Sequence, residues 1–589
     1  MEGFHGKGMK HVVLCPGNRS SPLAIAAGWL AEKGYINLTT AIDERSASFM
    51  ALGLSTANGL ATCVITTSGT AVAELLPAAV EADRSCQPLL LITADRPERL
   101  KNCGANQTVN QEEFLLPVAR SFCEGPKDGI HLVSPYLLAS LINDSWNSAH
   151  DFPGPVHLNL PLEEPLLANS TEQEQVFSGW SPSNFSDLQT SIKNVEKFSQ
   201  ASSDEFVGLD PGLPGLILAG PWRGQPKNLY GFQKTIFDWQ KISGWPIFAD
   251  PLSAIAIDQP GLIQHWELFL PLEFSFPFEN LQILRLGPIS VSRNLELWLK
   301  NISNNQILVT EGDPRNLDPI GISEQWSYGF ENWFRIFKSR NSSAYSSLTN
   351  ESFNSIKKSI MKDLLDRDLI AQSWLDRKLK LEGAVNEPAL AHWMPRLIPK
   401  KIPLMLSSSS PVRDWLSFPK PSKENRRIFA FRGASGIDGT LSLGCGLSME
   451  LGPLVLITGD LALLHDSNGW MFANSYRLKL VVLLIDNGGG GIFHQLHCEN
   501  LHAEKIDQLF SMPQSVDHLA LADAYHIPRR QVSCMEDLPN ALEWGFAQYG
   551  PVLLRVCTNP LRDSILRDEL RKGLAKKLKD ETNEGSPNS

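Results

Sequence analysis

The sequence has no C-x-x-C pair and no paired block of histidine and cysteine, although it contains nine cysteines in 589 residues. This pattern indicates neither a zinc site nor a disulfide framework, so we expect reduced thiols in a cytoplasmic environment. No apolar run approaches the roughly 20 residues that span a bilayer, and residues 1–10 lack the apolar core of a secretory signal. We therefore expect a cytoplasmic protein with no membrane partner.

The sequence also lacks an excess of positive charge, and its formal net charge is −11. Proteins that bind nucleic acids or membrane surfaces in general depend on positive fields, so this balance argues against both partners. Anionic substrates remain possible where arginines cluster locally. The length and the 42% hydrophobic content predict several globular domains with cores large enough to need no cross-links.

Short continuous apolar runs alternate with helical stretches, which is the βα order of parallel sheets buried on both faces. Strands are predicted at 11–15, 40–42, 61–66, 89–94, 215–219, 246–249, 281–286, 306–310, 404–407, 428–431, 454–458, 480–485 and 552–556. Helices are predicted at 22–32, 45–58, 70–83 and 357–379. We expect a three-domain α/β protein with parallel sheets flanked by helices, divided as residues 1–175, 206–345 and 380–575. A serine-rich linker is expected at 169–210 and a tail at 576–589.

Two predicted strands end in residues that suit a cation and a phosphate group. Gly459-Asp460 follows the first strand, and Asp486-Asn487 followed by four glycines ends the second. An isolated Gly-Asp pair is a common turn, but the spacing and the glycine run favour a bound ligand. The pattern resembles the GDG…NN signature of thiamine-diphosphate enzymes. Asp460, Asn487 and the Gly489 carbonyl would then bind Mg²⁺ or Mn²⁺.

Glu44 follows the predicted strand at 40–42 and has two interpretations. It can be a solvated acid at a helix start, stabilised by the helix dipole. Thiamine enzymes, however, have a glutamate at this place that hydrogen-bonds the cofactor's pyrimidine ring and promotes loss of a proton from the reacting carbon.

Seven blocks spread over the whole chain resemble one family of thiamine-diphosphate enzymes. They are PGNRS at 16–20, DER at 43–45, TSGTA at 67–71, TADRP at 93–97, CGANQ at 103–107, RGASGIDG at 432–439 and GDL at 459–461. The family is 2-succinyl-5-enolpyruvyl-6-hydroxy-3-cyclohexene-1-carboxylate synthase, also called the MenD family. The CGANQ and ASGIDG blocks are far more specific than the cofactor signature that all thiamine enzymes share.

The resemblance implies a transferase of menaquinone or phylloquinone biosynthesis. Such an enzyme decarboxylates 2-oxoglutarate and adds the succinyl unit to isochorismate by 1,4-addition, giving the family's named product and CO₂. The resemblance also implies pyrimidine-binding, central and diphosphate-binding domains in that order. A homodimer or a dimer of dimers is expected, in which Glu44 and Asp460 of different subunits act on one thiamine diphosphate.

Both implied substrates are dicarboxylates, and guanidinium groups bind carboxylates in bidentate fashion better than lysine does. The resemblance assigns Arg413 with Ser409 to the 2-oxoglutarate carboxylate and Arg432 to the neighbourhood of the reacting ring. The catalytic residues would be Glu44, Arg96, Arg413 and Arg432. Contacts to the cofactor are expected from Glu44, Ser409, Ala434, Ile437, Gly459, Asp460, Leu461, Asn487, Ile492 and Phe493. Contacts to the substrates are expected from Asn18, Arg19, Arg96, Asn106, Gln107, Arg293, Ser409, Arg413, Phe493 and Leu496.

Each assignment has a structural alternative, which is a surface ion pair for an arginine and an ordinary core position for Ile437, Ile492, Phe493 or Leu496. Two departures from the family stand out. Asn294 follows Arg293 where a Lys-Arg pair is usual, and the glycine-rich residues 2–8 replace the usual helix before the first strand. Part of the first domain's covering layer is therefore expected to be absent.

Two other functions compete with this interpretation. One is a different thiamine-diphosphate decarboxylase or carboligase, similar to acetohydroxyacid synthase, although Arg413, Arg96 and CGANQ argue against a monocarboxylate acceptor. The other is a catalytically silent homologue that binds metabolites or partners as a regulator, which the retained Glu44, Asp460 and Asn487 disfavour.

Overall fold

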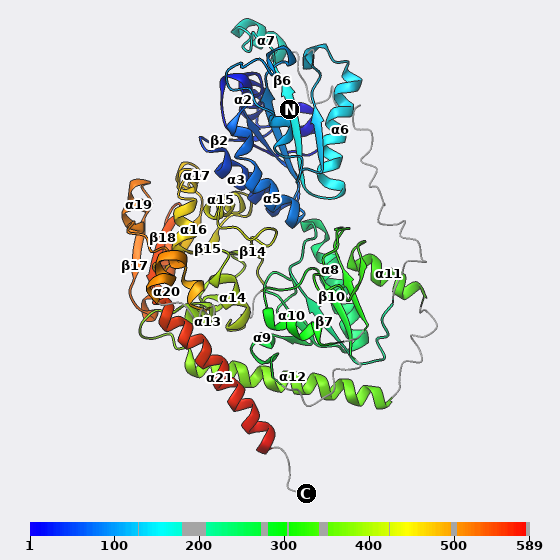
Figure 1. Cartoon of the computed structure of the whole chain (residues 1–589), viewed down its shortest axis with the longest axis vertical. Helices are drawn as coiled ribbons and strands as arrows, with labels where there is room; N and C mark the ends of the chain where they lie inside the picture. The colour runs from blue at the N-terminus through cyan, green and yellow to red at the C-terminus, as the bar shows by residue number, and fades with distance from the viewer. Residues whose placement is uncertain are drawn as a thin grey trace. The chain divides into compact units, whose positions relative to one another are not determined.

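The computed structural model describes residues 1–127, 129–178, 208–272, 281–302, 305–340, 351–422, 425–495 and 503–584. Within these ranges the chain forms three six-stranded sheets of parallel strands, flanked by helices (Figure 1). The contacts divide the chain into two compact units. The first comprises Met1–Glu196, Phe431–Leu454 and Ala462–Leu480, and the second comprises Lys197–Ala430, Val455–Leu461 and Val481–Ser589.

The first sheet lies in the first unit and has the strand order β2-β1-β3-β4-β6-β5. Its strands are β1 His11–Leu14, β2 Asn37–Thr40, β3 Thr62–Thr66, β4 Leu89–Asp95, β5 Ser121–Glu124 and β6 Pro155–Pro161. Every residue of β1, β3, β4 and β6 is buried, which explains their continuous apolar character. The helices of this part are α1 Glu2–Gly6, α2 Ser21–Glu32, α3 Glu44–Asn58, α4 Thr70–Ala73, α5 Leu76–Ser85, α6 Pro135–Asp151 and α7 Ser170–Ser178.

The second sheet lies in the second unit and has the order β12-β11-β10-β7-β8-β9. Its strands are β7 Gly215–Ala219, β8 Ile247–Ala249, β9 Leu262–Ile263, β10 Gln282–Leu286, β11 Gln306–Val309 and β12 Glu324–Trp326. Trp239 is fully buried here, with Trp333 and Phe337 packed edge-on at 5.0 Å between ring centroids. The helices are α8 Leu229–Ser243, α9 Trp266–Phe269, α10 Arg293–Lys300, α11 Phe330–Arg340 and α12 Glu351–Lys378.

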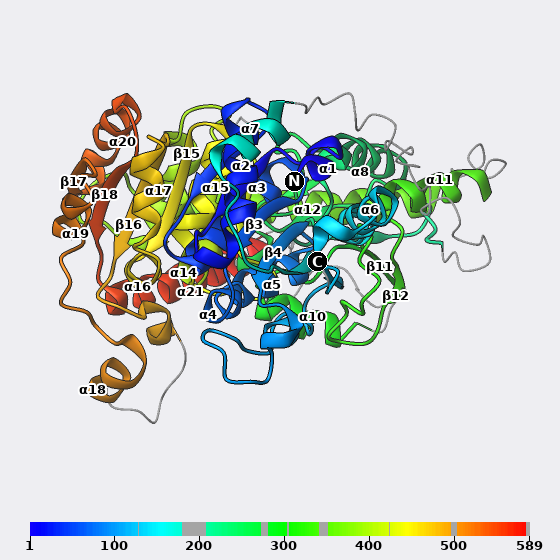
Figure 2. The same cartoon turned by 90° about the horizontal axis from the view of Figure 1, so that it is seen from above.

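The third sheet has the order β14-β13-β15-β16-β18-β17, and Figure 2 shows β16, β18 and β17 side by side. Its strands are β13 Leu404–Leu406, β14 Ile428–Ala430, β15 Leu454–Gly459, β16 Leu480–Asp486, β17 Arg529–Val532 and β18 Val552–Cys557. The helices that follow the crossing from the second sheet are α13 Glu387–Leu397, α14 Ser410–Ser417, α15 Thr440–Leu451, α16 Asp460–His465, α17 Gly469–Ser475, α18 Ala503–Ile506, α19 His518–Ala524, α20 Leu538–Ala547 and α21 Pro560–Glu584. Helices α15 and α17 belong to the first compact unit.

Helix α21 is buried along one stripe. Leu570, Leu574 and Leu578 recur every four residues and are each at most 5% exposed. The indole Nε1 of Trp374 on α12 donates a hydrogen bond to the Leu570 carbonyl at 3.0 Å, and Figure 1 shows the two helices together. This stripe explains why the helix runs through residues 576–584, where a tail was predicted.

Several other predictions needed correction. The strand predicted at 40–42 is β2 at Asn37–Thr40, because Ile42 is exposed and Thr39 is the buried residue of this edge strand. The helix predicted at 70–83 breaks into α4 and α5 at Glu74 and Leu75, just before Pro77. Helix α7 occupies the start of the predicted linker, and residues 179–207 of that linker lie outside the described ranges.

A short helix does precede the first strand. Helix α1 covers Glu2–Gly6 and buries Phe4, which packs against Trp146 of α6 at 6.4 Å between ring centroids. The expectation that no helix precedes the first strand was therefore wrong. Among the residues described, no helix is both long and apolar enough to cross a membrane.

Candidate active site

The ends of β15 and β16 are joined by one carboxylate. Asp460 directly follows β15, and its Oδ2 accepts a 2.7 Å hydrogen bond from the Gly489 backbone N–H. Its Oδ1 accepts a second bond, from the Leu461 N–H at 2.8 Å. Asp460 thus links the end of β15 to the glycine run that follows β16, and the contacts of Gly459, Asp460 and Leu461 to a cofactor stay a prediction.

Gly489 can only be glycine here. Its φ is +122°, and a Cβ built on it would lie 2.1 Å from the Ser511 carbonyl oxygen. The same oxygen accepts a 2.6 Å hydrogen bond from the Gly490 N–H. The glycine run is therefore closed against the segment 507–512, and this contact fixes the loop that carries Asn487.

Oxygen atoms at this corner fit a hard divalent cation. The buried Oδ1 of Asn487 has no hydrogen-bond partner, and burial raises the pKa of Asp460 to about 6, with nearby Asp486 adding to the shift. A cation would stabilise both groups, because it favours the ionised carboxylate and accepts the amide oxygen as a ligand. A cavity of about 330 Å³ opens beside Asp460 and is also lined by Asp486, His518 and Arg555.

The third predicted ligand, the Gly489 carbonyl, already accepts a hydrogen bond within the loop. The Gly489 carbonyl accepts a 2.8 Å hydrogen bond from the Gly491 N–H, so one of its two lone pairs is engaged. Its role as a ligand stays a prediction. The part of the chain that the structure describes holds no group of three or more histidine, cysteine or acidic side chains arranged for a metal. A cation here would therefore depend on one carboxylate supplemented by neutral oxygens.

Glu44 is the first residue of α3. Asp43 caps the helix by accepting hydrogen bonds from the N–H groups of Arg45 at 2.9 Å and Ser46 at 3.2 Å, so the helix starts at Glu44. Burial raises the pKa of Glu44, and the negative charges of Asp43 and Glu74 raise it further. A carboxyl group that keeps its proton more readily is suited to donate a hydrogen bond.

Arg19, Arg96 and Gln107 meet around Ser68 in the first unit. Arg96 donates to the Ser68 hydroxyl, and the Gln107 side-chain amide donates to the Ser68 carbonyl at 2.8 Å. Burial lowers the pKa of Arg96, and the positive charge of Arg19 lowers it further. Arg19 is 7% exposed, and its Nε has no partner. Two close guanidinium groups favour an anionic ligand.

The neighbours of these three residues complete the predicted set. Asn18 shares the 3₁₀ turn of Arg19, and Asn106 precedes Gln107, whose φ of +56° is unusual for a residue with a side chain. The structure brings Arg96 and Gln107 together at Ser68, with the charge of Arg19 close to Arg96, within the first unit. Their contacts to a substrate stay a prediction.

Ser409 and Arg413 are also brought together. Ser409 precedes α14 with a φ of +77°, and its carbonyl accepts a 2.7 Å hydrogen bond from Arg413 Nη1. Burial lowers the pKa of Arg413. The next residue, Ser410, accepts a 3.2 Å bond from Gln495, which ends the turn that holds Ile492 and Phe493.

Ile492 and Phe493 are half-buried rather than core residues. The Phe493 ring lies 5.3 Å from that of Phe510 between centroids. Leu496, predicted to line the same site, lies outside the described residues.

The loop that carries Arg432, Ala434 and Ile437 is held by an acid that the sequence did not reveal. Glu81 of α5 accepts hydrogen bonds from the four successive N–H groups of residues 432–435, at 3.1, 2.7, 2.6 and 3.3 Å. Glu81 is 4% exposed. Ile437 itself is half-buried within its unit, so it is not an ordinary core residue.

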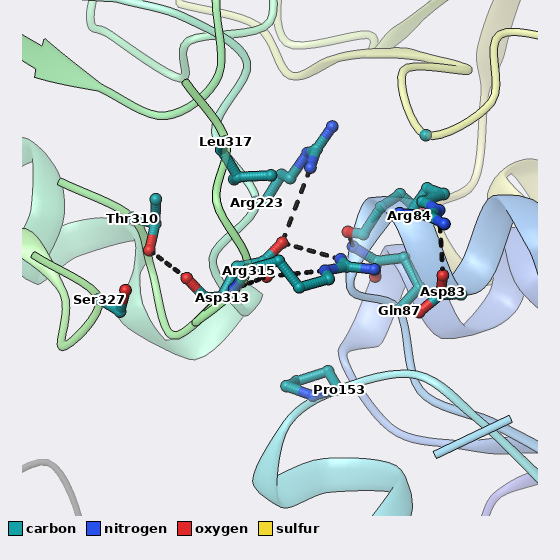
Figure 3. A network of polar contacts seen from close by, with 12 residues as sticks. Asp83, Arg84, Gln87, Pro153, Arg223, Thr310, Asp313, Arg315, Leu317 and Ser327 are labelled. Atoms are coloured by element: carbon teal, nitrogen blue, oxygen red, sulfur yellow. Dashed lines mark hydrogen bonds and ion pairs between the residues drawn. The ribbon is translucent and has the colours of Figure 1, made fainter. Parts of the chain in front are cut away.

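Arg293 is exposed in the first turn of α10. Its neighbour Asn294 donates to buried Glu267 at 3.3 Å, which gives this departure from the family a packing role. Figure 3 shows two arginines of the same unit that were not predicted: Arg315 donates to both oxygens of buried Asp313 at 2.8 and 2.9 Å, and Arg223 lies 3.8 Å from it.

Sequence reasoning also missed Glu387, which accepts a 2.7 Å hydrogen bond from the Asn487 side-chain amide. Both Glu81 and Glu387 lie on helices, where an acid is usually solvated. The sequence carried no local signal for either one.

Two family models match the chain. The model described as "Thiamine pyrophosphate enzyme, N-terminal TPP binding domain" matches residues 2–114, and the one described as "Thiamine pyrophosphate enzyme, C-terminal TPP binding domain" matches residues 414–556. These matches include Glu44 in the first region and Asp460 with Asn487 in the second.

Curated relatives match nearly the whole chain. A protein of Prochlorococcus marinus strain MIT 9313 is 55% identical over 96% of this chain and 97% of its own length. Proteins of Synechococcus sp. strain CC9311 and Parasynechococcus marenigrum strain WH8102 are 53% and 51% identical, and cover 98% and 96% of this chain with 99% and 98% of their own lengths. All three are named 2-succinyl-5-enolpyruvyl-6-hydroxy-3-cyclohexene-1-carboxylate synthase.

Proposed function

Since the chain belongs to the 2-succinyl-5-enolpyruvyl-6-hydroxy-3-cyclohexene-1-carboxylate synthase family, we propose how its own residues carry out the family's reaction. The chain is a thiamine-diphosphate-dependent transferase that decarboxylates 2-oxoglutarate and joins the succinyl unit to isochorismate in menaquinone or phylloquinone biosynthesis. The observation that carries the residue assignments is the corner of Asp460 and Asn487, where a buried amide oxygen has no partner beside a carboxylate of raised pKa.

Asp460 and Asn487 would hold Mg²⁺ or Mn²⁺, with the Gly489 carbonyl as a third ligand, and the cation would bind the diphosphate. Thiamine diphosphate, when bound, supplies the carbon nucleophile and the electron sink that decarboxylation of a 2-oxo acid requires. Glu44 would hold a proton at its carboxyl group and would donate it in a hydrogen bond to the pyrimidine ring. Ala434, Ile437, Ile492 and Phe493 would shape the cofactor's surroundings and exclude water.

The arginines would bind the two dicarboxylates. Arg413 and Ser409 are assigned to 2-oxoglutarate, and Arg432 to the neighbourhood of the reacting carbon. Arg19 and Arg96 would bind isochorismate, together with Asn18, Asn106 and Gln107. Arg19 is buried and Arg413 is half-buried, which supports these roles, because a guanidinium shielded from water gains more from a carboxylate than a solvated one does. Arg293 is exposed, and the family resemblance assigns it a contact to substrate.

By family resemblance we propose a homodimer or dimer of dimers in which Glu44 and Asp460 of different subunits serve one cofactor. We also propose a cytoplasmic enzyme with domains at 1–175, 206–345 and 380–575. Sedimentation of the purified chain, with and without cofactor, tests the assembly.

The decisive variant is Glu44→Gln. We expect its turnover of 2-oxoglutarate with isochorismate to fall by about 10²–10⁴-fold, because the amide cannot deliver the proton of the carboxyl group. Binding of thiamine diphosphate with Mg²⁺, followed by calorimetry, should survive. Activity close to that of the parent would refute the role of Glu44.

The same assay separates the competing functions. Consumption of 2-oxoglutarate that isochorismate does not alter would indicate a different decarboxylase or carboligase. Failure of the parent chain to bind thiamine diphosphate would indicate a silent homologue.

A further inference from the structure

Asn487 can serve as a cation ligand in only one orientation of its side chain. The two ends of the amide have nearly the same shape, but one is an oxygen and the other an NH₂ group with no free lone pair. Rotation of the amide by half a turn would present the wrong group to the cation. A neighbouring residue is therefore needed to fix the orientation in which Oδ1, and not Nδ2, points toward the cation.

In this structure Glu387 fixes the orientation of the Asn487 amide. Its Oε1 accepts a hydrogen bond from Asn487 Nδ2 at 2.7 Å, while the buried Oδ1 of Asn487 has no partner. A carboxylate can only accept, so the end of the amide that faces Glu387 must be the NH₂ group. The oxygen is then directed away from Glu387.

Glu387 is itself fixed as an acceptor. It is 3% exposed, and its Oε2 forms a 2.5 Å ion pair with Arg567 Nη2. Its backbone N–H donates to Asp563 Oδ2 at 3.1 Å. Arg567 also binds both oxygens of Asp414, at 2.8 and 2.5 Å. The arginine therefore remains in place and supplies the positive charge that a buried carboxylate needs.

Gly491 leaves room for the NH₂ end of the same amide. A Cβ added to this glycine would lie 2.5 Å from Asn487 Nδ2 and 2.9 Å from its Cγ. Such a Cβ would displace the amide, so the missing side chain leaves the space that Asn487 occupies. The NH₂ end of Asn487 thus lies against both the Glu387 carboxylate and the Gly491 backbone.

We propose that Glu387 is a positioning residue that turns the Asn487 oxygen toward the divalent cation, and that Arg567 holds Glu387 in this role. The inference rests on the proposed cation site at Asp460 and Asn487. It assigns to helices α13 and α21 a part in cofactor binding, although neither helix carries a residue of the family's motifs.

The test is the Mg²⁺ affinity of the purified full chain with thiamine diphosphate present, measured by titration calorimetry rather than by turnover. Glu387→Gln should weaken Mg²⁺ binding about 10–100-fold, which is the usual effect of losing a residue that orients a metal ligand. A glutamine can donate to Asn487 Oδ1, and it thereby favours the flipped amide. Arg567 keeps Asp414 as its partner in this variant.

A second substitution should reverse the loss. In Glu387→Gln combined with Asn487→Asp, the aspartate has oxygens at both ends, so one accepts from the glutamine and the other faces the cation. We expect Mg²⁺ affinity to return to within a few-fold of the parent. Asn487→Asp alone sets two carboxylates in contact and should bind Mg²⁺ poorly. Asn487→Asp would thus weaken Mg²⁺ binding in the parent but strengthen it in Glu387→Gln. Such a reversal indicates that the two side chains interact directly.

Glu267→Gln is the matched control. Glu267 is also buried, and it accepts hydrogen bonds from Ser417 at 2.8 Å and Asn294 at 3.3 Å, but it does not contact Asn487. A general loss of stability would appear in both variants, whereas weakened Mg²⁺ binding should appear only in Glu387→Gln. If Glu387→Gln does not fold, Gly491→Ala tests the same point, because its Cβ pushes on the amide while Glu387 stays intact.

The positioning role would be overturned if Glu387→Gln bound Mg²⁺ as tightly as the parent. If Glu387→Gln is unfolded, the same result in Gly491→Ala would overturn it. Absence of rescue in the double variant would also overturn it. If the parent chain itself bound no Mg²⁺ with thiamine diphosphate, the proposed function would fail first, and the two failures are thereby distinguished.

Discussion

Glu81 and Glu387 are both buried glutamates that hold parts of the candidate active site, but they do so in different ways. Glu81 accepts four backbone N–H groups from residues 432–435 and so fixes the path of a loop. Glu387 accepts one side-chain N–H from Asn487 and so fixes the direction of an amide. The first role places no demand on the loop's side chains, whereas the second depends on the identity of residue 487.

The two acids also differ in how their charge is balanced. Among the described residues the Glu81 carboxylate accepts hydrogen bonds from backbone N–H groups, and burial raises its pKa in spite of them. Glu387 shares the cation Arg567 with Asp414, and Asp563 lies against its backbone. With three acids around one arginine, burial and the charge of Glu387 raise the pKa of Asp563 to about 7.

The largest effect should come from removing the shared cation. We expect Arg567→Met to lower the free energy of unfolding by about 3–5 kcal/mol, because it leaves Glu387 and Asp414 buried without a counter-charge. Lys572→Met is the control on the same helix, since Lys572 and its partner Asp568 are both exposed at 3.9 Å, and should cost below about 1 kcal/mol. Urea denaturation measures the unfolding free energy of both variants. Equal losses in the two would show that the buried counter-charge is not the cause.

The next effect concerns the loop. Glu81→Gln replaces one acceptor oxygen by an NH₂ group that faces backbone donors, and should cost about 2–3 kcal/mol in unfolding free energy. Hydrogen exchange of the amides at 432–435 should speed up in this variant but not in Glu387→Gln. If both variants left these amides equally protected, the distinction between a loop acceptor and an amide acceptor would not hold.

The smallest effect depends on pH. The folded-state pKa of Asp563 is about 7, above its ordinary unfolded value, so the folded chain binds an extra proton between about pH 4 and 7. Its stabilising contribution is complete at low pH and is lost as the pH rises through 7. Asp563→Asn keeps an oxygen for the Glu387 N–H and should flatten this slope, gaining about 1–2 kcal/mol at pH 8 and nothing at pH 4. Urea denaturation of the variant and of the parent at both pH values shows whether the variant is the more stable one at the higher pH.

The buried parallel strands were the most predictable part of the fold. The boundaries of β7 were predicted as found, because five consecutive apolar residues lie between turns. Strand β6 was missed since prolines stand at both ends and since His157 and Asn159 are polar. Both are fully buried and hydrogen-bonded to Thr93 at 2.8 Å. A polar residue that is satisfied by a distant partner does not show its burial in the sequence.

The candidate site follows the same rule. Asp460 and Asn487 were predictable because glycines and strand ends mark a place where backbone and ligand approach closely. Arg19 and Arg96 stand in motif blocks and Arg413 was assigned by the family resemblance, and the binding roles of the three stay a prediction. Glu81 and Glu387 were not, because their partners are 351 to 354 and 100 residues away in the chain. Local pattern gives no reason to distinguish them from solvated helix acids.

The arrangement around Glu387 also bears on when the site can form during translation. Its contacts reach 100 residues along the chain to Asn487 and 180 residues to Arg567. Domains generally fold as they leave the ribosome, in order from the N-terminus. A nascent chain that has passed Asn487 but not Arg567 already contains every family motif. It nevertheless lacks the charge that holds Glu387, so its cation ligand remains free to turn either way until helix α21 has been made.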